Sequence, residues 1–458
     1  MRNRFIYIGC LLACSVMLAS CLGKDDDEVT YYDDTAITAF SLGTLKYNKR
    51  VNADSVANTT LDCSGYKFYI DQQKRIIYNP DSLPVGVDVS KTVASVSVKN
   101  SASVVLKDND SDSLSYWASS DSIDFTQPRI LRVYNHNGEY REYTVSVNVH
   151  KQYGDTLAWS NVGMPDGLTA SSGLRIYAAS DRIFLLTNKG GFTAPRPAAA
   201  NWSKMSQPFD AMAYANAAVL NDTLYVLSDG KLLRTADGEH WTSGSTNIKR
   251  LLGASKTRLY AFDANGMIAS STKGVDWTEE SLNESTDWLP ANDISICARP
   301  LKTNEDSYRL LLCGNRTYTL GDTTAVVWGK IEEPSTAEAQ GWSLFKWDVT
   351  NPYPLPAQYN LQVVAYDGMF VALGGTSTMM INSTSGSAKS FYRSADNGIT
   401  WQRDTTMALP SGFAAFDNFA LTADKDNYLW IADATTGIVW RGRINRLGWT
   451  EDQKAFTE

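Results

Sequence analysis

A recurring turn that ends in tryptophan constrains the fold of this chain more than any other feature. In residues 394–401, Ser394, Asp396, Gly398 and Trp401 occupy fixed positions of the pattern S-x-D-x-G-x-T-W. A carboxylate in such a turn accepts hydrogen bonds from backbone N–H groups just downstream, and the glycine supplies a positive φ. The tryptophan packs between neighbouring sheets. The pattern therefore predicts a structural turn between two strands and not a catalytic motif.

The same turn returns in two altered copies. Thr235, Asp237, Gly238 and Trp241 form a copy that is one residue shorter, and residues 271–277 form another that has lost the aspartate. Each copy follows two apolar runs separated by a Gly/Asp/Asn turn. Aligned on these turns, residues 155–458 contain six repeats at spacings near the propeller period. We therefore expect a six-bladed β-propeller, with residues 157–162 as a closing strand or as part of a seventh blade.

A shift in composition separates this region from the residues before it. Twelve of the 13 tryptophans lie in 155–458, whereas residues 35–151 contain one. In the earlier segment apolar residues alternate at a period of two, as in 94–98 and 143–149, and polar turn clusters separate the runs. Short alternating strands without a helical period predict an immunoglobulin-like (Ig-like) β-sandwich over 35–151. The whole chain is thus expected to be all-β.

The start of the chain predicts export and lipid attachment. Arg2 and Arg4 precede an apolar stretch that is too short to span a bilayer permanently, so residues 1–20 are expected to be a signal peptide. The run Leu18-Ala19-Ser20-Cys21 resembles a lipobox, which implies cleavage before Cys21 and its acylation. An ordinary cleaved signal or an uncleaved anchor is the alternative. Residues 21–34 are expected to form an acidic tether, which either is a plain hydrophilic spacer or, as its resemblance implies, acts as the export signal of surface lipoproteins.

Charge and residue types limit the partners. Against 42 Lys and Arg the chain has 50 Asp and Glu, so nucleic acid is not an expected partner. The three histidines are not spaced as metal ligands, and we expect no metal and no cofactor. Cys297 and Cys313 lie symmetrically about a polar turn. If their runs pair as a hairpin, the two thiols face each other. The two cysteines then either form a strained cross-strand disulfide or, as we favour, pack as two small buried apolar residues.

Taken together, the lipobox, the sandwich domain and the tryptophan turns resemble a family of surface lipoproteins of gut Gram-negative (Bacteroidetes-type) bacteria. Members combine an N-terminal Ig-like domain with a C-terminal Asp-box (BNR-like) β-propeller of unknown function. The resemblance implies an outer-membrane, lipid-anchored protein exposed on the cell surface. It implies a fold and no activity.

The Asp-box turn also occurs in sialidases, so a sialidase-like glycoside hydrolase is one alternative. Such an enzyme needs clustered arginines, a tyrosine nucleophile and acidic partners. Arg299, Arg316 and Arg393 are available, but no local motif joins them. The sequence therefore favours a non-catalytic propeller over an enzyme.

Two binding partners fit that role. One is a glycan, held by aromatic side chains in long connections, and the other is a neighbouring outer-membrane protein for which the chain serves as a scaffold subunit. The candidate ligand-binding residues are Trp288, Trp347, Tyr353 and Tyr359.

Overall fold

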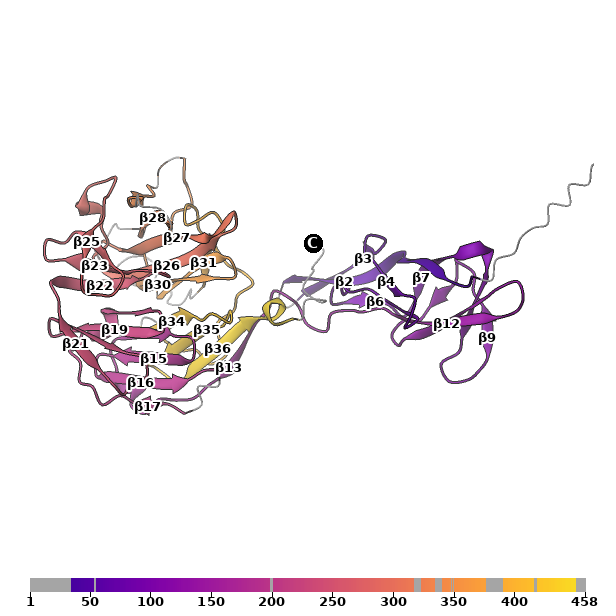
Figure 1. Cartoon of the computed structure of the whole chain (residues 1–458), viewed down its shortest axis with the longest axis horizontal. Helices are drawn as coiled ribbons and strands as arrows, with labels where there is room; N and C mark the ends of the chain where they lie inside the picture. The colour runs from indigo at the N-terminus through magenta and orange to yellow at the C-terminus, as the bar shows by residue number, and fades with distance from the viewer. Residues whose placement is uncertain are drawn as a thin grey trace, which may run out of the picture. The chain divides into compact units, whose positions relative to one another are not determined.

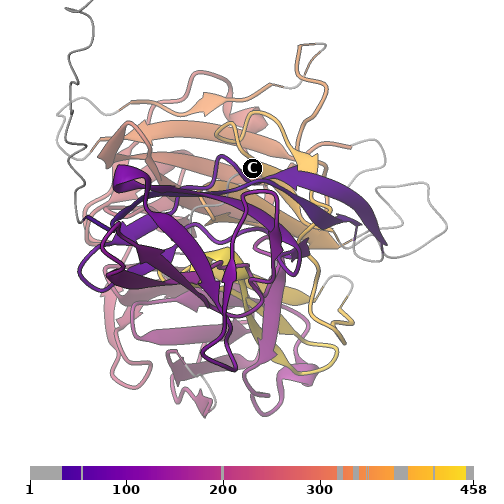
Figure 2. The ribbon, with the colours of Figure 1, turned by 90° about the vertical axis from the view of Figure 1, so that its right-hand side faces the viewer.

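The computed structural model describes residues 34–52, 55–197, 201–316, 323–333, 340–346, 348, 350–375, 390–415 and 418–449. The chain divides into two compact units, Met1–Lys151 with Ala455–Glu458, and Gln152–Lys454. Strands joined by turns and short 3₁₀ segments make up the described part of both units (Figures 1 and 2). None of its helices is long and apolar enough to cross a membrane. The predicted all-β fold is confirmed.

Among its described residues, the N-terminal unit contains three sheets around one apolar core. Its first sheet has the order β1 (Ile37–Leu42), β7 (Thr92–Val98), β10 (Ser122–Ile123). Its second has the order β4 (Tyr69–Asp71), β5 (Ile76–Tyr78), β12 (Tyr140–Ser146), β11 (Arg129–Tyr134), β8 (Ser103–Lys107), β9 (Leu114–Tyr116). Its third has the order β3 (Ser55–Asp62), β2 (Thr44–Asn52), β6 (Val87–Asp88).

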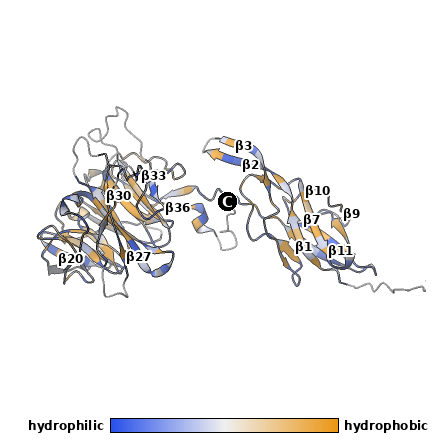
Figure 3. Ribbon diagram, turned by 90° about the horizontal axis from the view of Figure 1, so that it is seen from above, coloured by the Kyte–Doolittle hydropathy of each residue, from blue (hydrophilic) through white to orange (hydrophobic). Residues whose placement is uncertain are grey.

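Alternation along these strands explains their packing. Ile37 and Ala94 from the first sheet share a core with Leu131 and Tyr143 from the second, and all four are buried. Because side chains on a strand point alternately to opposite faces, strands such as β7 and β12 bury one set of side chains in the core and leave the other set more exposed. Figure 3 shows apolar residues along β1 and β7. Pairing is antiparallel except between β5 and β12, which run parallel.

The second unit contains six four-stranded sheets among its described residues, which we number as blades 1 to 6. Blade 1 is β14 (Leu174–Ala178), β15 (Arg182–Thr187), β16 (Gly190–Pro195) and β17 (Ser203–Lys204); blade 2 is β18 (Ala217–Leu220), β19 (Thr223–Ser228), β20 (Lys231–Thr235) and β21 (Thr242–Ser245). Blade 3 is β22 (Ile248–Ala254), β23 (Leu259–Asp263), β24 (Ile268–Ser271) and β25 (Thr278–Glu279); blade 4 is β26 (Asn292–Leu301), β27 (Asn304–Asn315), β28 (Val326–Glu332) and β29 (Ser343–Leu344).

Blade 6 joins the two ends of the propeller. Blade 5 is β30 (Tyr359–Tyr366), β31 (Met369–Gly375), β32 (Tyr392–Ser394) and β33 (Gln402–Arg403); blade 6 is β34 (Phe419–Ala423), β35 (Leu429–Asp433), β36 (Val439–Ile444) and β13 (Leu157–Asn161). β13, from the start of the unit, pairs antiparallel with β36 near its end (Figure 1). Of the two expectations for this segment, the closing strand is the one observed. Because its outer strand comes from the other end of the unit, blade 6 closes the ring.

Apolar clusters between consecutive blades hold the ring together. One cluster combines Leu174 of blade 1 with Trp430 of blade 6, and another combines Phe184 of blade 1 with Val226 of blade 2. Four further clusters lie between the remaining neighbouring blades. Each sheet therefore buries both faces against its neighbours, which explains the nearly continuous apolar runs in its central strands.

The turn at residues 394–401 is built from its own side chains. Asp396 accepts from the backbone N–H of Thr400 (2.9 Å) and from its hydroxyl (2.6 Å), and Ser394 Oγ accepts from Gly398 N (2.8 Å). Trp401 Nε1 donates to the Gly398 carbonyl (3.0 Å), and its ring is buried between blades 4 and 5. These contacts are all internal to the fold, as expected of a structural turn.

The shorter copy of the turn is similar. Asp237 accepts from the backbone N–H groups of Glu239 and His240 (both 2.8 Å), and Trp241 Nε1 donates to the Gly238 carbonyl (3.1 Å). Thr235 Oγ1 accepts from Gly238 N (2.8 Å). A hydroxyl thus satisfies the glycine N–H in both copies.

The expectation that Cys297 and Cys313 face each other was wrong. β26 and β27 pair as a hairpin, but Cys297 lies opposite Leu311, and Cys313 lies opposite Ser295. The hairpin turns between Leu301 and Asn304, and in the register that follows the two cysteines are offset by two residues, so they are diagonal neighbours. Both thiols are free and buried, and burial raises the pKa of each.

Candidate ligand-binding cavity

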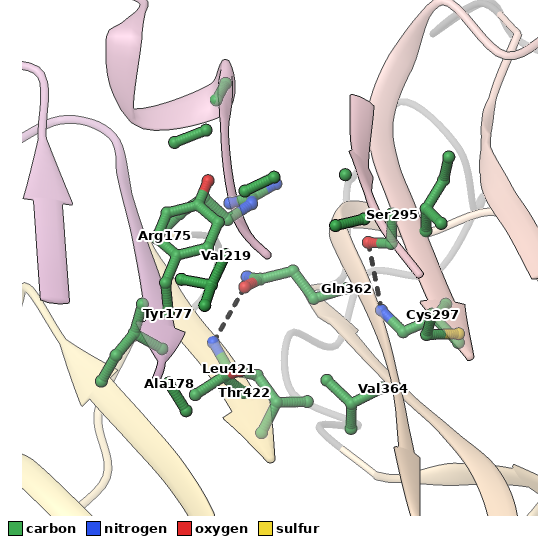
Figure 4. Close-up of a pocket in the computed structure, with 18 of the residues that line it drawn as sticks. Arg175, Tyr177, Ala178, Val219, Ser295, Cys297, Gln362, Val364, Leu421 and Thr422 are labelled. Carbon is green, nitrogen blue, oxygen red and sulfur yellow. Dashed lines mark hydrogen bonds between the residues drawn. The ribbon is translucent and has the colours of Figure 1, made fainter. Parts of the chain in front are cut away.

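A cavity of about 910 Å³ lies at the centre of the propeller. Its walls come from the innermost strands of all six blades, β14, β18, β22, β26, β30 and β34, and from the turns next to them. Figure 4 shows Arg175 and Tyr177 on one side of this space, and Ser295 and Cys297 on the other. A cavity of this size is typical of small-molecule and saccharide sites.

One end of the cavity is ringed by alanines, which we call the collar: Ala178, Ala254, Ala298, Ala365 and Ala423. Each stands at or near the end of the innermost strand of its blade, and each is half-buried. A methyl group reaches less far from the backbone than any larger side chain. Each alanine also packs against an apolar cluster between neighbouring blades.

The other end, where the innermost strands begin, is polar, and we call it the mouth. It is defined by Arg175 of β14, Arg250 of β22, Asp293 of β26 and Asn360 of β30. Arg175 Nη1 donates to the carbonyl of the preceding residue, Leu174 (3.0 Å), and to Asn360 Oδ1. Its Nη2 lies 3.9 Å from Asp293 Oδ1, which is an ion pair without a hydrogen bond. Arg175 thus connects blade 1 to blades 4 and 5 across the cavity.

Backbone irregularities position two of these side chains. Asp293 and Asn360 both have φ of 51°, and the register of each strand shifts at that point. Positive φ is unfavourable for residues other than glycine, although Asp and Asn tolerate it best. A bulge of this kind redirects a side chain that a regular strand would send into the blade. Both residues reach Arg175 because of it.

Aromatic and amide groups complete the wall. Tyr177 donates its hydroxyl to the Tyr214 carbonyl (2.7 Å), and burial raises the pKa of Tyr177 although the nearby charges of Arg175 and Arg250 oppose the shift. Gln362 accepts from Leu421 N (2.8 Å), so its amide joins blades 5 and 6 (Figure 4). These contacts fix the shape of the cavity before any ligand is bound.

The structure separates the aromatic residues predicted to bind a ligand. Tyr359 lines the cavity at the mouth. Trp288 is 39% exposed, with the Arg316 guanidinium 4.5 Å from its ring, and Asn292 of the cavity wall donates to the Arg316 carbonyl (3.3 Å). The Trp288–Arg316 pair is therefore next to the mouth.

The remaining predicted residues lie elsewhere. Tyr353 is exposed beside a smaller pocket on the outer strands of blade 5, away from the central cavity. Trp347 and Cys21 lie outside the described residues.

The three arginines considered for a sialidase site each contact different partners. Arg299 donates to the Gly368 carbonyl (2.7 Å) and to Asn397, Arg316 covers Trp288, and Arg393 pairs with Asp404 (3.2 Å). They do not form a carboxylate-binding cluster. Within the described residues, no group of three His, Cys, Asp or Glu side chains could hold a metal ion.

Sequence reasoning missed the mouth and the collar. Arg175, Asp293 and Asn360 belong to three blades and meet only because the ring closes, so no local pattern announces them. The collar did leave a signal, because an alanine recurs near the end of the first strand in five of the six repeats.

Both parts of the chain match known protein families. Residues 153–452 match the DUF6242 beta propeller domain, and residues 40–147 match the DUF6242 N-terminal domain, a domain of unknown function. The chain belongs to the DUF6242 family. The predicted fold, a β domain followed by a β-propeller, is confirmed by these matches. No curated protein matches this DUF6242 chain.

Three solved structures match the chain at low identity. A Bacteroides fragilis NCTC 9343 protein classed as secreted is 18% identical to the DUF6242 chain, covers 27% of it and 100% of its own length, and has a TM-score of 0.19. A Trichoderma reesei carbohydrate-active enzyme of family AA12 is 11% identical, with 63% and 96% covered and a TM-score of 0.42. Trypanosoma rangeli sialidase is 11% identical, with 68% and 56% covered and a TM-score of 0.34.

Proposed function

We propose that the chain is a lipid-anchored outer-membrane protein, displayed on the cell surface, whose propeller binds a glycan in its central cavity without cleaving it. In this proposal Cys21 carries the anchor, and the N-terminal unit is an Ig-like spacer. The observation that carries the proposal is the cavity itself, which has a polar mouth and tyrosines in its wall. Convergent polar groups beside aromatic rings suit the hydroxyls and the apolar faces of sugars.

The distribution of carboxylates supports binding rather than hydrolysis. Glycoside hydrolysis ordinarily needs two carboxyl groups about 5–10 Å apart on either side of the scissile bond. Among the described cavity-lining residues, Asp293 is the single carboxylate at the mouth. Asp222 and Asp424 lie in turns at the collar end, where they accept hydrogen bonds from Ser180 N (2.7 Å) and Trp430 Nε1 (2.8 Å) respectively. Asp293 therefore lies at the opposite end of the cavity from the other two carboxylates, both of which are held in turn contacts.

A glycan array tests this proposal. The mature chain, with Cys21→Ser to keep it soluble, is screened for binding, and every glycan that binds is incubated with it and assayed for released sugar. We expect binding without release. Release of sugar would overturn the non-catalytic role. The absence of any glycan ligand would overturn glycan binding and leave a scaffold role, which co-purification with outer-membrane proteins would then detect.

A further inference from the structure

The mouth of the cavity is positively charged in a chain whose formal net charge is −8. Arg175 and Arg250 line it, and Arg316 stands next to it over Trp288. Asp293 is the one opposing carboxylate among the described lining residues at this end. Because the rest of the molecule repels anions, a local excess of arginine indicates a ligand that carries negative charge.

Arg175 has the geometry of a group prepared for an anion. Its side chain is 14% exposed and that of Asp293 is 13% exposed, so both are largely removed from water. The hydrogen bonds of the guanidinium to Leu174 O and Asn360 Oδ1 are both donated by Nη1. Its Nη2 faces Asp293 at 3.9 Å, beyond hydrogen-bond distance. A guanidinium has five N–H donors in a fixed fork, so donors remain for a second pair of oxygens.

The surrounding residues hold this group in place. Asn360 fixes one side of the guanidinium and in turn donates to the Phe419 carbonyl (2.7 Å), while Asn315 donates to Asp293 Oδ2 (3.0 Å). Asp293 and Asn360 keep the unfavourable positive φ that brings them to Arg175. Strain retained by two neighbouring blades at the same depth is typical of a functional site.

We infer that the cavity takes an acidic saccharide, whose carboxylate or sulfate group pairs with Arg175 at the mouth while the sugar rings enter the cavity. This inference rests on the proposed function, since it assigns the class of glycan to the same site. Both acidic groups present oxygens that match the guanidinium fork. Arg250 adds positive charge on the neighbouring wall, and its Nη1 is fixed by the Ala291 carbonyl (2.6 Å).

The test uses matched probes. An array carries oligogalacturonates beside their methyl esters, and sulfated oligosaccharides beside their desulfated forms, together with neutral and sialylated glycans. We expect the mature chain to bind an acidic member at least tenfold more tightly than its neutral counterpart, because a hydrogen bond to a charged group is worth about tenfold or more in affinity. The carboxylate arm and the sulfate arm show which acid is taken.

Three variants connect the preference to the mouth. Arg175→Gln is expected to lose the preference for the acidic probe, whereas Arg234→Gln, which changes an exposed arginine in β20, should keep it. Asp293→Asn removes the opposing charge and should tighten binding of the acidic probe, a gain that misfolding cannot mimic.

The outcomes separate this inference from the proposed function. Equal affinity for acidic and neutral partners, or a preference that survives Arg175→Gln, would overturn the acidic-ligand inference while glycan binding stands. Binding to no glycan at all would overturn both.

Discussion

At the scale of single residues, the buried ion pair between blades 3 and 4 makes the sharpest stability prediction. Lys330 Nζ lies 2.5 Å from Glu280 Oε2, and both residues are buried. Lys330→Met leaves the Glu280 carboxylate buried without its partner, so we expect a loss of about 3–5 kcal/mol in the free energy of unfolding. Urea denaturation of the purified variant measures it.

The double variant Glu280→Gln/Lys330→Met is the control for that prediction. It removes both charges, so it should recover a large part of the lost stability. If the double variant is as unstable as Lys330→Met alone, the cost comes from lost packing and not from an unpaired charge.

Asp396 predicts a specific dependence of stability on pH. Burial raises the pKa of this carboxyl, but hydrogen bonds from Thr400 and Ser394 outweigh burial and hold the pKa below its ordinary value. A group whose pKa is lowered by folding contributes stability above its unfolded pKa, and this contribution is lost as pH falls through the folded pKa. The stability advantage of the wild type over Asp396→Asn should therefore shrink on acidification below about pH 4. Urea denaturation at pH 7 and at pH 3 checks this, and an advantage that is independent of pH would contradict it.

At the scale of elements, two glycine turns of blade 3 separate strain from crowding. Gly266 and Gly274 have φ of 82° and 74°, but a Cβ on Gly274 would lie 2.7 Å from Leu232 Cδ2, whereas one on Gly266 would meet nothing within 4 Å. Gly266→Ala is expected to cost about 1–2 kcal/mol from backbone strain alone. Gly274→Ala should cost roughly 1–3 kcal/mol more, because it adds overpacking between blades 2 and 3. Equal thermal shifts for the two variants would show that the interface yields freely.

Local turns and hairpins could be predicted from the sequence, whereas strand register and contacts between distant blades could not. The turn at 394–401 was predictable because the hydrogen bonds made by Ser394, Asp396 and Trp401 Nε1 all lie within eight residues of chain. The hairpin of β26 and β27 was predictable too, but its register was not, because the strands turn between Leu301 and Asn304 and the register shifts at Pro300. The contact between Arg175 and Asn360 depends on ring closure, which no local pattern encodes.

At the scale of the whole molecule, β13 is predicted to hold the propeller closed. Leu157 of β13 is buried among side chains of blades 5 and 6, and its strand is the one that joins the ends of the unit. Leu157→Ala should cost roughly 2–5 kcal/mol and lower the melting transition of the entire propeller. Leu131→Ala, in the core of the N-terminal unit, should lower a different transition, because each unit has its own core. Calorimetry resolves the two, and an unchanged propeller transition in Leu157→Ala would contradict closure by β13.

Protection of a thiol in the cavity wall from alkylation would show whether a glycan occupies the propeller cavity. Val219 is half-buried in the wall, so Val219→Cys places a reactive group there (Figure 4). Val93→Cys, 42% exposed in the N-terminal unit, is the matched control. The rate of alkylation at each site is followed by mass spectrometry with and without a glycan that binds on the array. We expect the glycan to slow alkylation at position 219 and to leave the alkylation rate at position 93 unchanged. Equal rates at position 219 with the glycan bound would contradict binding in the cavity.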